Sequence, residues 1–224
     1  ISDNGFTSAA RSIPAREVGG VFHMFREYGD GVYLVTMGSV DHKGIPGALR
    51  ASAISGIIRV MTELDVRDPA EIIEMTNRLC VSEKFDDSPL ALFICFVDIP
   101  NRRIDFVNAG DICPVMIRDG VARYLRFSDR SRGDMGRSDF RSGCVRIQVK
   151  PGDRFVMLSG SIRELKNSDG KKAGLARVAK FLESCQGDSP AIIDSLLSFT
   201  EKYTGGFDRR KDMSVLAFTF GEDM

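Results

Sequence analysis

The sequence is poor in the residues that build zinc sites and disulfide frameworks. Its 224 residues include two histidines, His23 and His42, and five cysteines that never form a Cys-x-x-Cys pair. A zinc site needs three or four nitrogen or sulfur ligands at matched spacing, so this content argues against one. The cysteine number is odd and several cysteines lie in apolar runs, which favours buried thiols in a reducing compartment over disulfides.

An excess of either charge and a long apolar run are also missing. Lysine plus arginine and aspartate plus glutamate number 31 each, so the formal net charge is zero. A nucleic-acid-binding surface needs a basic excess on one face, and the charge balance argues against it. No apolar run reaches the length of a membrane span, and no signal-peptide pattern is present. We therefore expect a cytoplasmic domain with no nucleic-acid partner and no membrane contact.

Hydrophobic residues make up 43% of the chain, which is enough for a sizeable core. Periodicity and capping signals predict helices over 46–64, 69–80, 175–182 and 189–203, the last with Ser189 as its N-cap. Apolar and alternating runs predict strands over 32–37, 90–98, 104–108, 114–117, 144–150, 154–158 and 213–220. Strands in two clusters with helices between them indicate an α+β fold of packed layers.

The most informative segment covers residues 38–49 and reads Gly-Ser-Val-Asp-His-Lys-Gly-Ile-Pro-Gly-Ala-Leu. It follows a strand pattern and leads into a helix pattern, which predicts a strand-loop-helix corner. It resembles the corner Gly-Asp-Val-Ser-Gly-Lys-Gly-Val-Pro-Ala-Ala-Leu of bacterial metal-dependent (type 2C-like, PPM) serine phosphatases of the stage II sporulation protein E family. In that family the aspartate of the corner holds catalytic metal. Here the position is Ser39.

Four further segments resemble motifs of the same family, in the same order along the chain. They cover 15–25 (Ala-Arg-Glu-Val-Gly-Gly-Asp-Phe-Tyr-Asp-Phe in the family), 106–110 (Tyr-Val-Asn-Ala-Gly), 152–164 (Gly-Asp, then Tyr-Ser-Asp-Gly-Ile-Thr-Glu) and 211–215 (Asp-Asp-Ile-Thr-Leu). The acidic positions of these motifs are the ones that differ. Val21 and Met24 replace the two aspartates of the first motif, and Gly160 and Lys211 replace metal-binding aspartates of the last two. Asp111 replaces the histidine that follows the second motif.

The resemblance implies a PP2C-like α-β-β-α sandwich, in which two packed antiparallel β-sheets are flanked by helices on both sides. We expect one such domain over residues 1–224, taken from a longer multidomain protein. Family members bind two Mn²⁺ or Mg²⁺ ions through carboxylates and waters, and a metal-activated water attacks phosphoserine. Four positions are then vestigial metal-site positions: Val21, Ser39, Gly160 and Lys211. We expect no metal cofactor, because the carboxylates are missing and an ammonium group repels a divalent cation.

Three functions remain open at this point. The first is a pseudophosphatase regulatory module that binds a protein partner, such as an anti-sigma-factor antagonist, under the control of an upstream sensor or receiver domain. The alternative is an active phosphoserine phosphatase that holds Mn²⁺ or Mg²⁺ in a substitute site of Asp41, Asp111 and Asp212. Against it, Asp212 should point away from residue 211 in an extended segment, and Asp41 has the character of a turn residue. The third is a structural domain that transmits a signal as a homodimer.

Three further regions carry additional interpretations. Residues 126–141 contain five arginines and three aspartates, which indicates either a mixed-charge surface loop or a docking loop. Lys211 and Arg163 would suit an anion at the vacated site. The helices predicted between 46 and 80 are candidates for regulatory contacts, by analogy with the family.

Overall fold

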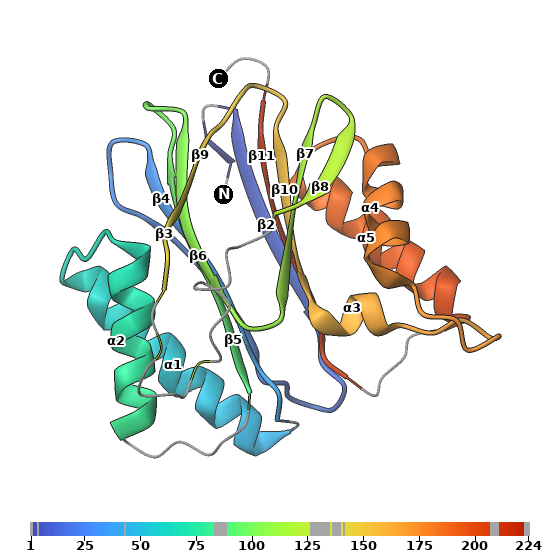
Figure 1. Ribbon diagram of the computed structural model, residues 1–224, viewed down its shortest axis with the longest axis horizontal. Coiled ribbons are helices and arrows are strands. Elements are labelled where there is room, and N and C mark those ends of the chain that lie inside the picture. The colour runs from blue at the N-terminus through green and yellow to red at the C-terminus, as the bar shows by residue number, and fades with distance from the viewer. Residues whose placement is uncertain are drawn as a thin grey trace. The chain divides into compact units, whose positions relative to one another are not determined.

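The structure, a computed structural model, describes residues 2–3, 5–42, 44–82, 89–125, 135, 140, 142–206 and 211–221. These residues form eleven strands and five helices, arranged in two compact units with one antiparallel sheet in each (Figure 1). Unit 1 comprises residues 1–16, 113–125 and 150–224, and unit 2 comprises residues 17–112 and 126–149. The chain therefore crosses between the units several times.

Unit 1 contains a six-stranded sheet in the order β1-β2-β11-β10-β7-β8. Its elements are β1 (Ser2–Asp3), β2 (Phe6–Ile13), β7 (Ile112–Arg118), β8 (Val121–Tyr124), β10 (Arg154–Ser159), β11 (Met213–Phe220), α3 (Gly160–Glu164), α4 (Gly174–Ser184) and α5 (Ser189–Thr204). The apolar faces of α4 and α5 cover one face of the sheet, where Leu182 and Leu196 share a core with Val156 and Val215 (Figure 1). Every residue of β11, near the middle of this sheet, is buried.

Unit 2 contains a five-stranded sheet in the order β3-β4-β5-β6-β9. Its elements are β3 (Val21–Glu27), β4 (Val32–Val40), β5 (Leu90–Asp98), β6 (Arg103–Ala109), β9 (Val145–Gln148), α1 (Ile45–Glu63) and α2 (Pro69–Ser82). Both helices pack on one face of the sheet, and Ile54, Ile58 and Ile72 share a core with Leu92 and Ile94. Every residue of β5 is buried, as its continuous apolar run predicts.

One capping prediction is wrong. Asp188, not Ser189, is the N-cap of α5, and its carboxylate accepts a hydrogen bond of 3.1 Å from the Ala191 amide. Ser189 is fully buried, and its hydroxyl donates to the carbonyl of Thr7 at 2.8 Å. The hydroxyl therefore joins α5 to β2 and is not needed as a helix cap.

The thiol prediction is confirmed for three of the five cysteines. Cys80, Cys95 and Cys185 are buried and free, whereas Cys113 is partly buried and Cys144 is exposed. Burial raises the pKa of the Cys80 and Cys185 thiols, which keeps them protonated and unreactive.

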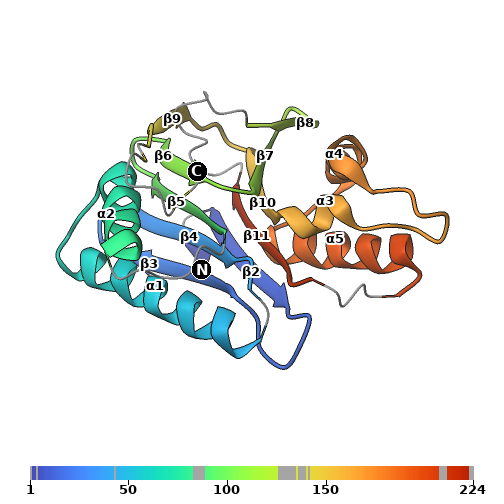
Figure 2. The same cartoon turned by 60° about the horizontal axis from the view of Figure 1, so that its bottom comes forward.

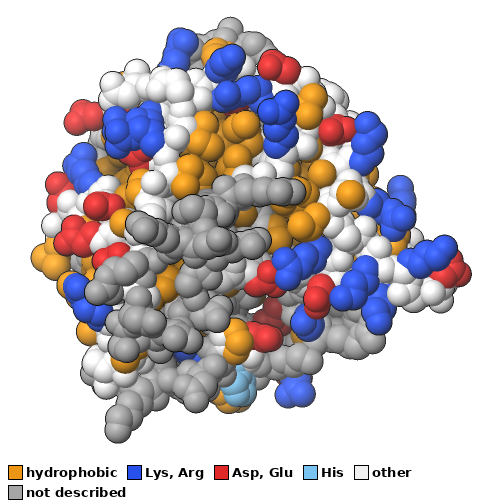
Figure 3. Space-filling model, viewed as in Figure 1, with side chains coloured by type: hydrophobic (Ala, Val, Ile, Leu, Met, Phe, Trp, Pro, Cys, Tyr) orange, Lys and Arg blue, Asp and Glu red, His pale blue; other side chains and the backbone are white. Residues whose placement is uncertain are grey.

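Most of the arginine-rich segment 126–141 lies outside the described residues. Met135 and Phe140 are described, and both are buried in the core between the helices and the sheet of unit 2. Over the face seen in Figure 3, basic and acidic side chains are interspersed, in keeping with the zero net charge. Within the described ranges, no helix combines the length and apolar content that crossing a membrane requires.

Candidate functional site

The predicted strand-loop-helix corner is present between β4 and α1. Gly44 precedes α1 with a φ of 71°, a backbone conformation that side chains other than glycine rarely adopt. Gly38 and Gly47 have no room for a side chain, because a Cβ would lie 2.1 Å from the Phe22 ring and 1.9 Å from the His42 carbonyl oxygen, respectively. The glycines of the motif therefore fix the course of the backbone at this corner.

Two of the predicted vestigial positions face each other in unit 2. Val21 on β3 pairs directly with Ser39 on β4, and both are partly buried. Together they offer one neutral hydroxyl oxygen and no carboxylate. Met24, which stands where the family motif has its second aspartate, is buried in the core beneath the helices. That position has thus become part of the hydrophobic packing of the unit.

The segment at residues 106–110, which resembles the family's Tyr-Val-Asn-Ala-Gly motif, leads into a turn between β6 and β7. Gly110 has a φ of 80°, and a Cβ there would lie 2.8 Å from the Cα of Ala91. The side-chain amide of Asn108 donates to the carbonyl of Ile112 at 2.9 Å and closes the turn. Asp111 is exposed at its tip. The retained Asn-Ala-Gly sequence therefore has a structural explanation that requires no ligand.

The other two positions that the sequence predicts to be vestigial lie in unit 1. Gly160 is the first residue of α3, directly after β10, and contributes no side chain. The hydroxyl of Ser159 accepts a hydrogen bond of 2.9 Å from the Ser214 amide, and the Ser161 hydroxyl donates to the Asp212 carbonyl at 2.7 Å. These bonds tie the end of β10 to the start of β11.

Lys211 has an acidic partner. Its ammonium nitrogen lies 3.2 Å from a carboxylate oxygen of Glu164, at the end of α3, and Lys172 lies 3.8 Å from the other oxygen. The hydrogen bond and charge of Lys211 lower the pKa of the Glu164 carboxyl group. Arg163 lies 3.5 Å from the Cys113 sulfur. A free anion at Lys211 would therefore have to compete with Glu164.

The three candidate substitute acids are divided between the units. In unit 1, one carboxylate oxygen of Asp212 accepts a hydrogen bond of 2.8 Å from the Ala15 amide. This bond joins the chain after β2 to the residue before β11. Asp41 and Asp111, in unit 2, are both exposed. Searched over the described ranges, the chain has no cluster of three His, Cys, Asp or Glu side chains suited to a metal ion.

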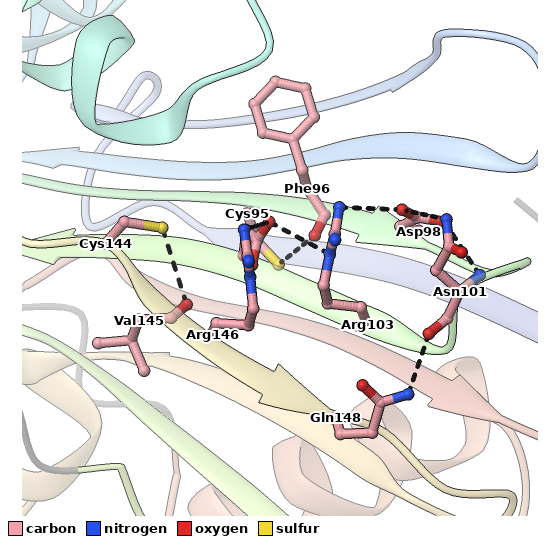
Figure 4. A network of polar contacts seen from close by, with 10 residues as sticks. Cys95, Phe96, Asp98, Asn101, Arg103, Cys144, Val145, Arg146 and Gln148 are labelled. Carbon is pink, nitrogen blue, oxygen red and sulfur yellow. Dashed lines mark hydrogen bonds and ion pairs between the residues drawn. The ribbon is translucent and has the colours of Figure 1, made fainter.

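The acidic residues with the most developed contacts lie elsewhere, on β5 and β6 of unit 2 (Figure 4). Asp98 accepts hydrogen bonds from Asn101 and from Arg103, the latter at 3.1 Å. Asp105 accepts two from Arg146, at 2.6 and 3.0 Å. These carboxylates are compensated by arginines across the strand pairs, so they stabilise the sheet and do not form a cation site. No sequence motif points to Asp98 or Asp105.

Asp153, from the Gly-Asp of the third family motif, is likewise structural. Its side chain is 1% exposed and accepts hydrogen bonds of 2.8 Å from the Arg118 Nε and from the Lys150 amide. A buried carboxylate needs such partners, because an unpaired charge in the interior is strongly destabilising. The motif residue thus closes the turn before β10.

Comparisons with known proteins agree with this scaffold. The sequence profile described as Stage II sporulation protein E (SpoIIE) matches residues 29–221. No protein of curated function matches the sequence. The SiaA-PP2C domain of Pseudomonas aeruginosa is 24% identical with a TM-score of 0.83, over 95% of this chain and 85% of that one.

Two further solved structures are similar. The PP2C phosphatase domain with a regulatory-domain fragment of SpoIIE from Bacillus subtilis is 18% identical, with a TM-score of 0.82 over 96% of this chain. The RsbU and RsbW domains of a Mycobacterium tuberculosis protein are 19% identical, with a TM-score of 0.80 over 97% of this chain. The chain spans 63% and 62% of those two structures. These likenesses confirm the predicted fold class, an α+β fold of two antiparallel sheets with flanking helices. The chain belongs to the Stage II sporulation protein E family and has its PP2C-like fold.

Proposed function

We propose that this chain is a catalytically inactive, phosphatase-like module that regulates a bacterial signalling pathway by binding a protein partner. The observation that carries the proposal is the set of side chains at the four vestigial positions. They supply an alkyl group at Val21, a hydroxyl at Ser39, no side chain at Gly160, and at Lys211 an ammonium paired with Glu164.

This set does not fit the metals of the family. Mn²⁺ and Mg²⁺ are hard cations that prefer carboxylate and water oxygens, and one neutral hydroxyl is a poor substitute for four carboxylates. Asp212, the candidate acid next to Lys211, already accepts a hydrogen bond from the Ala15 amide. Phosphoester hydrolysis in this family depends on a metal-activated water, so loss of the carboxylates removes the nucleophile.

The retained residues support a binding role. The motif glycines and Asn108 preserve turns in which a side chain would clash or a backbone carbonyl would lose its partner. A scaffold of this kind can present a protein-binding surface after the metal ligands are gone. The M. tuberculosis structure contains RsbU and RsbW domains, and another similar structure comes from the bacterial stressosome. By analogy, we propose a partner-switching protein, such as an anti-sigma-factor antagonist, as the partner.

The experiment is a titration of the chain with a serine-phosphorylated antagonist protein, with Mn²⁺ and with chelator. The proposal predicts binding that the chelator does not weaken, with the phosphate retained on the antagonist. Manganese-dependent release of phosphate would contradict it and support the alternative of an active phosphatase.

Asp212→Asn is the variant that separates these outcomes. An asparagine keeps an acceptor oxygen for the Ala15 amide and removes the carboxylate charge. Turnover that disappears in this variant would identify Asp212 as a metal ligand. Under our proposal the variant binds the antagonist as the native chain does.

A further inference from the structure

Helix α1 exposes an unusual amount of apolar surface. Its inner side packs on β3, β4 and α2, and Figure 2 shows the helix along its full length beside β3. Ile45, Leu49 and Val60 on its outer side are 68%, 67% and 59% exposed, and Leu64, directly after the helix, is 72% exposed. Three of the eight exposed large hydrophobic residues in the described part of the chain thus lie in one helix, and a fourth follows it directly.

The middle of this outer side is formed by small residues. Ala53 and Gly56 are both exposed, and a Cβ at Gly56 would meet no atom within 4 Å. Glycine inside a helix lowers its stability relative to alanine, and no described neighbour requires glycine here. A second helix crossing at this point would explain the glycine, because small side chains let two helix backbones approach closely.

The apolar stripe, defined as Ile45, Leu49, Ala53, Gly56, Val60 and Leu64, is symmetric about the midpoint between residues 54 and 55. In an antiparallel pair of α1 helices centred there, Ile45 faces Leu64, Leu49 faces Val60, and Ala53 faces Gly56. Large residues meet large ones at both ends and small residues meet in the centre. Self-complementarity of this kind is what a two-fold symmetric interface requires, and a heterologous partner does not require it.

We propose that a second copy of this chain binds to the apolar stripe of α1, with the two helices antiparallel. The stripe exposes roughly 500 Å² of apolar surface per copy, so two copies bury about 1,000 Å², which is the lower bound for a specific interface. The dimer is accordingly weak and depends on protein concentration. At the flank of the stripe, Glu63 is ion-paired with Arg26, so its charge is compensated.

Sedimentation velocity over a range of concentrations tests the proposal. The native chain is expected to shift from monomer to dimer as its concentration rises. Leu49→Arg should weaken the dimer at least tenfold, because it places a charge opposite Val60 of the other copy. Val121→Arg, at a 45% exposed position on β8, is the matched control and should leave the dimer unchanged. A native chain that stays monomeric up to its solubility limit would overturn the proposal.

Cross-linking tests the helix orientation in a Cys144→Ser background, which removes the exposed native thiol. Leu49→Cys and Val60→Cys proteins are oxidised separately and as a mixture. In the antiparallel pair, two copies of residue 49 lie about 16 Å apart along the helix axis, so only the mixture should yield a disulfide-linked dimer. If each variant forms disulfide-linked dimers when it is oxidised alone, and the mixture yields no dimer that links the two variants, the interface is a different one and the proposal is overturned.

Discussion

Gly47, in the first turn of α1, lies where a Cβ would stand 1.9 Å from the carbonyl oxygen of His42. Gly20 is similarly constrained, since its Cβ would lie 2.6 Å from the carbonyl oxygen of Val40. Gly20 matches a glycine of the family's first motif, whereas Gly47 stands where the family's corner has alanine, so the tight approach to His42 belongs to this chain's own corner.

Gly47→Ala is predicted to lower the free energy of unfolding by about 1–3 kcal/mol, because the corner must shift to accommodate the new methyl group. Gly56→Ala, in the same helix, is the matched control and should raise it by about 0.5–1 kcal/mol, since its Cβ meets open space. Urea unfolding of dilute protein measures both. Equal effects of the two substitutions would show that the close approach at His42 does not constrain residue 47.

His23 makes folding sensitive to acid. It is partly buried on β3, and desolvation lowers its pKa from 6.5 to about 4. Below pH 6.5 the unfolded chain takes up a proton that the folded chain does not, so the free energy of unfolding falls as the pH drops from 6.5 towards 4.

Between pH 7 and pH 5 this loss should amount to about 2 kcal/mol, and His23→Gln should remove it. Chemical unfolding of the native chain and the variant at both pH values measures the difference. If both chains lose the same stability, His23 is not the group responsible.

At the scale of elements, uninterrupted apolar runs and the alternating run that forms β9 were predictable, whereas β2 and α3 were not. β5 and β11 match their predicted ranges because every residue in them is buried. β2 is missing from the prediction because half of its residues are polar. Its buried residues, Phe6 and Ser8, include a polar one, so the sequence shows no regular apolar alternation. α3 has five residues, too few to show helical periodicity.

The candidate site was also predictable only where a local sequence motif marks it. The resemblance to family motifs placed Val21 and Ser39, and the register of β3 and β4 explains why they lie together. The ion pair of Lys211 with Glu164 joins residues 47 positions apart, and the bond from Ala15 to Asp212 spans 197. No local pattern predicts such contacts, because they arise only when the sheet of unit 1 assembles.

The cap of α5 provides a test at this scale. Asp188→Ala should lower the free energy of unfolding by about 1 kcal/mol, because the Ala191 amide loses its acceptor. Asp194→Ala is the matched control, since its ion pair with Arg11 joins side chains that are 60% and 57% exposed. It should change stability by less than about 0.5 kcal/mol. Thermal unfolding distinguishes the two, and a larger effect at Asp194 would contradict the assignment of the cap.

At the scale of the whole molecule, each unit has its own sheet and helices, and each carries two of the positions that we interpret as vestigial. Unit 2 holds Val21 and Ser39, and unit 1 holds Gly160 and Lys211. In our account the loss of metal ligands is thus spread over the chain and leaves the PP2C-like fold in place. We propose that regulation through partners, and through a second copy at α1, depends on that fold and not on metal.

Calorimetric titration of the purified chain with Mn²⁺, repeated with Mg²⁺, tests the central claim most directly. The combined variant Val21→Asp, Ser39→Asp, Gly160→Asp and Lys211→Asp, which returns a carboxylate to each vestigial position, is titrated alongside. Our account predicts no binding heat from the native chain up to millimolar metal and measurable binding by the combined variant. Tight binding of two ions by the native chain would contradict it, and would show that other acids of this sequence assemble a working metal site.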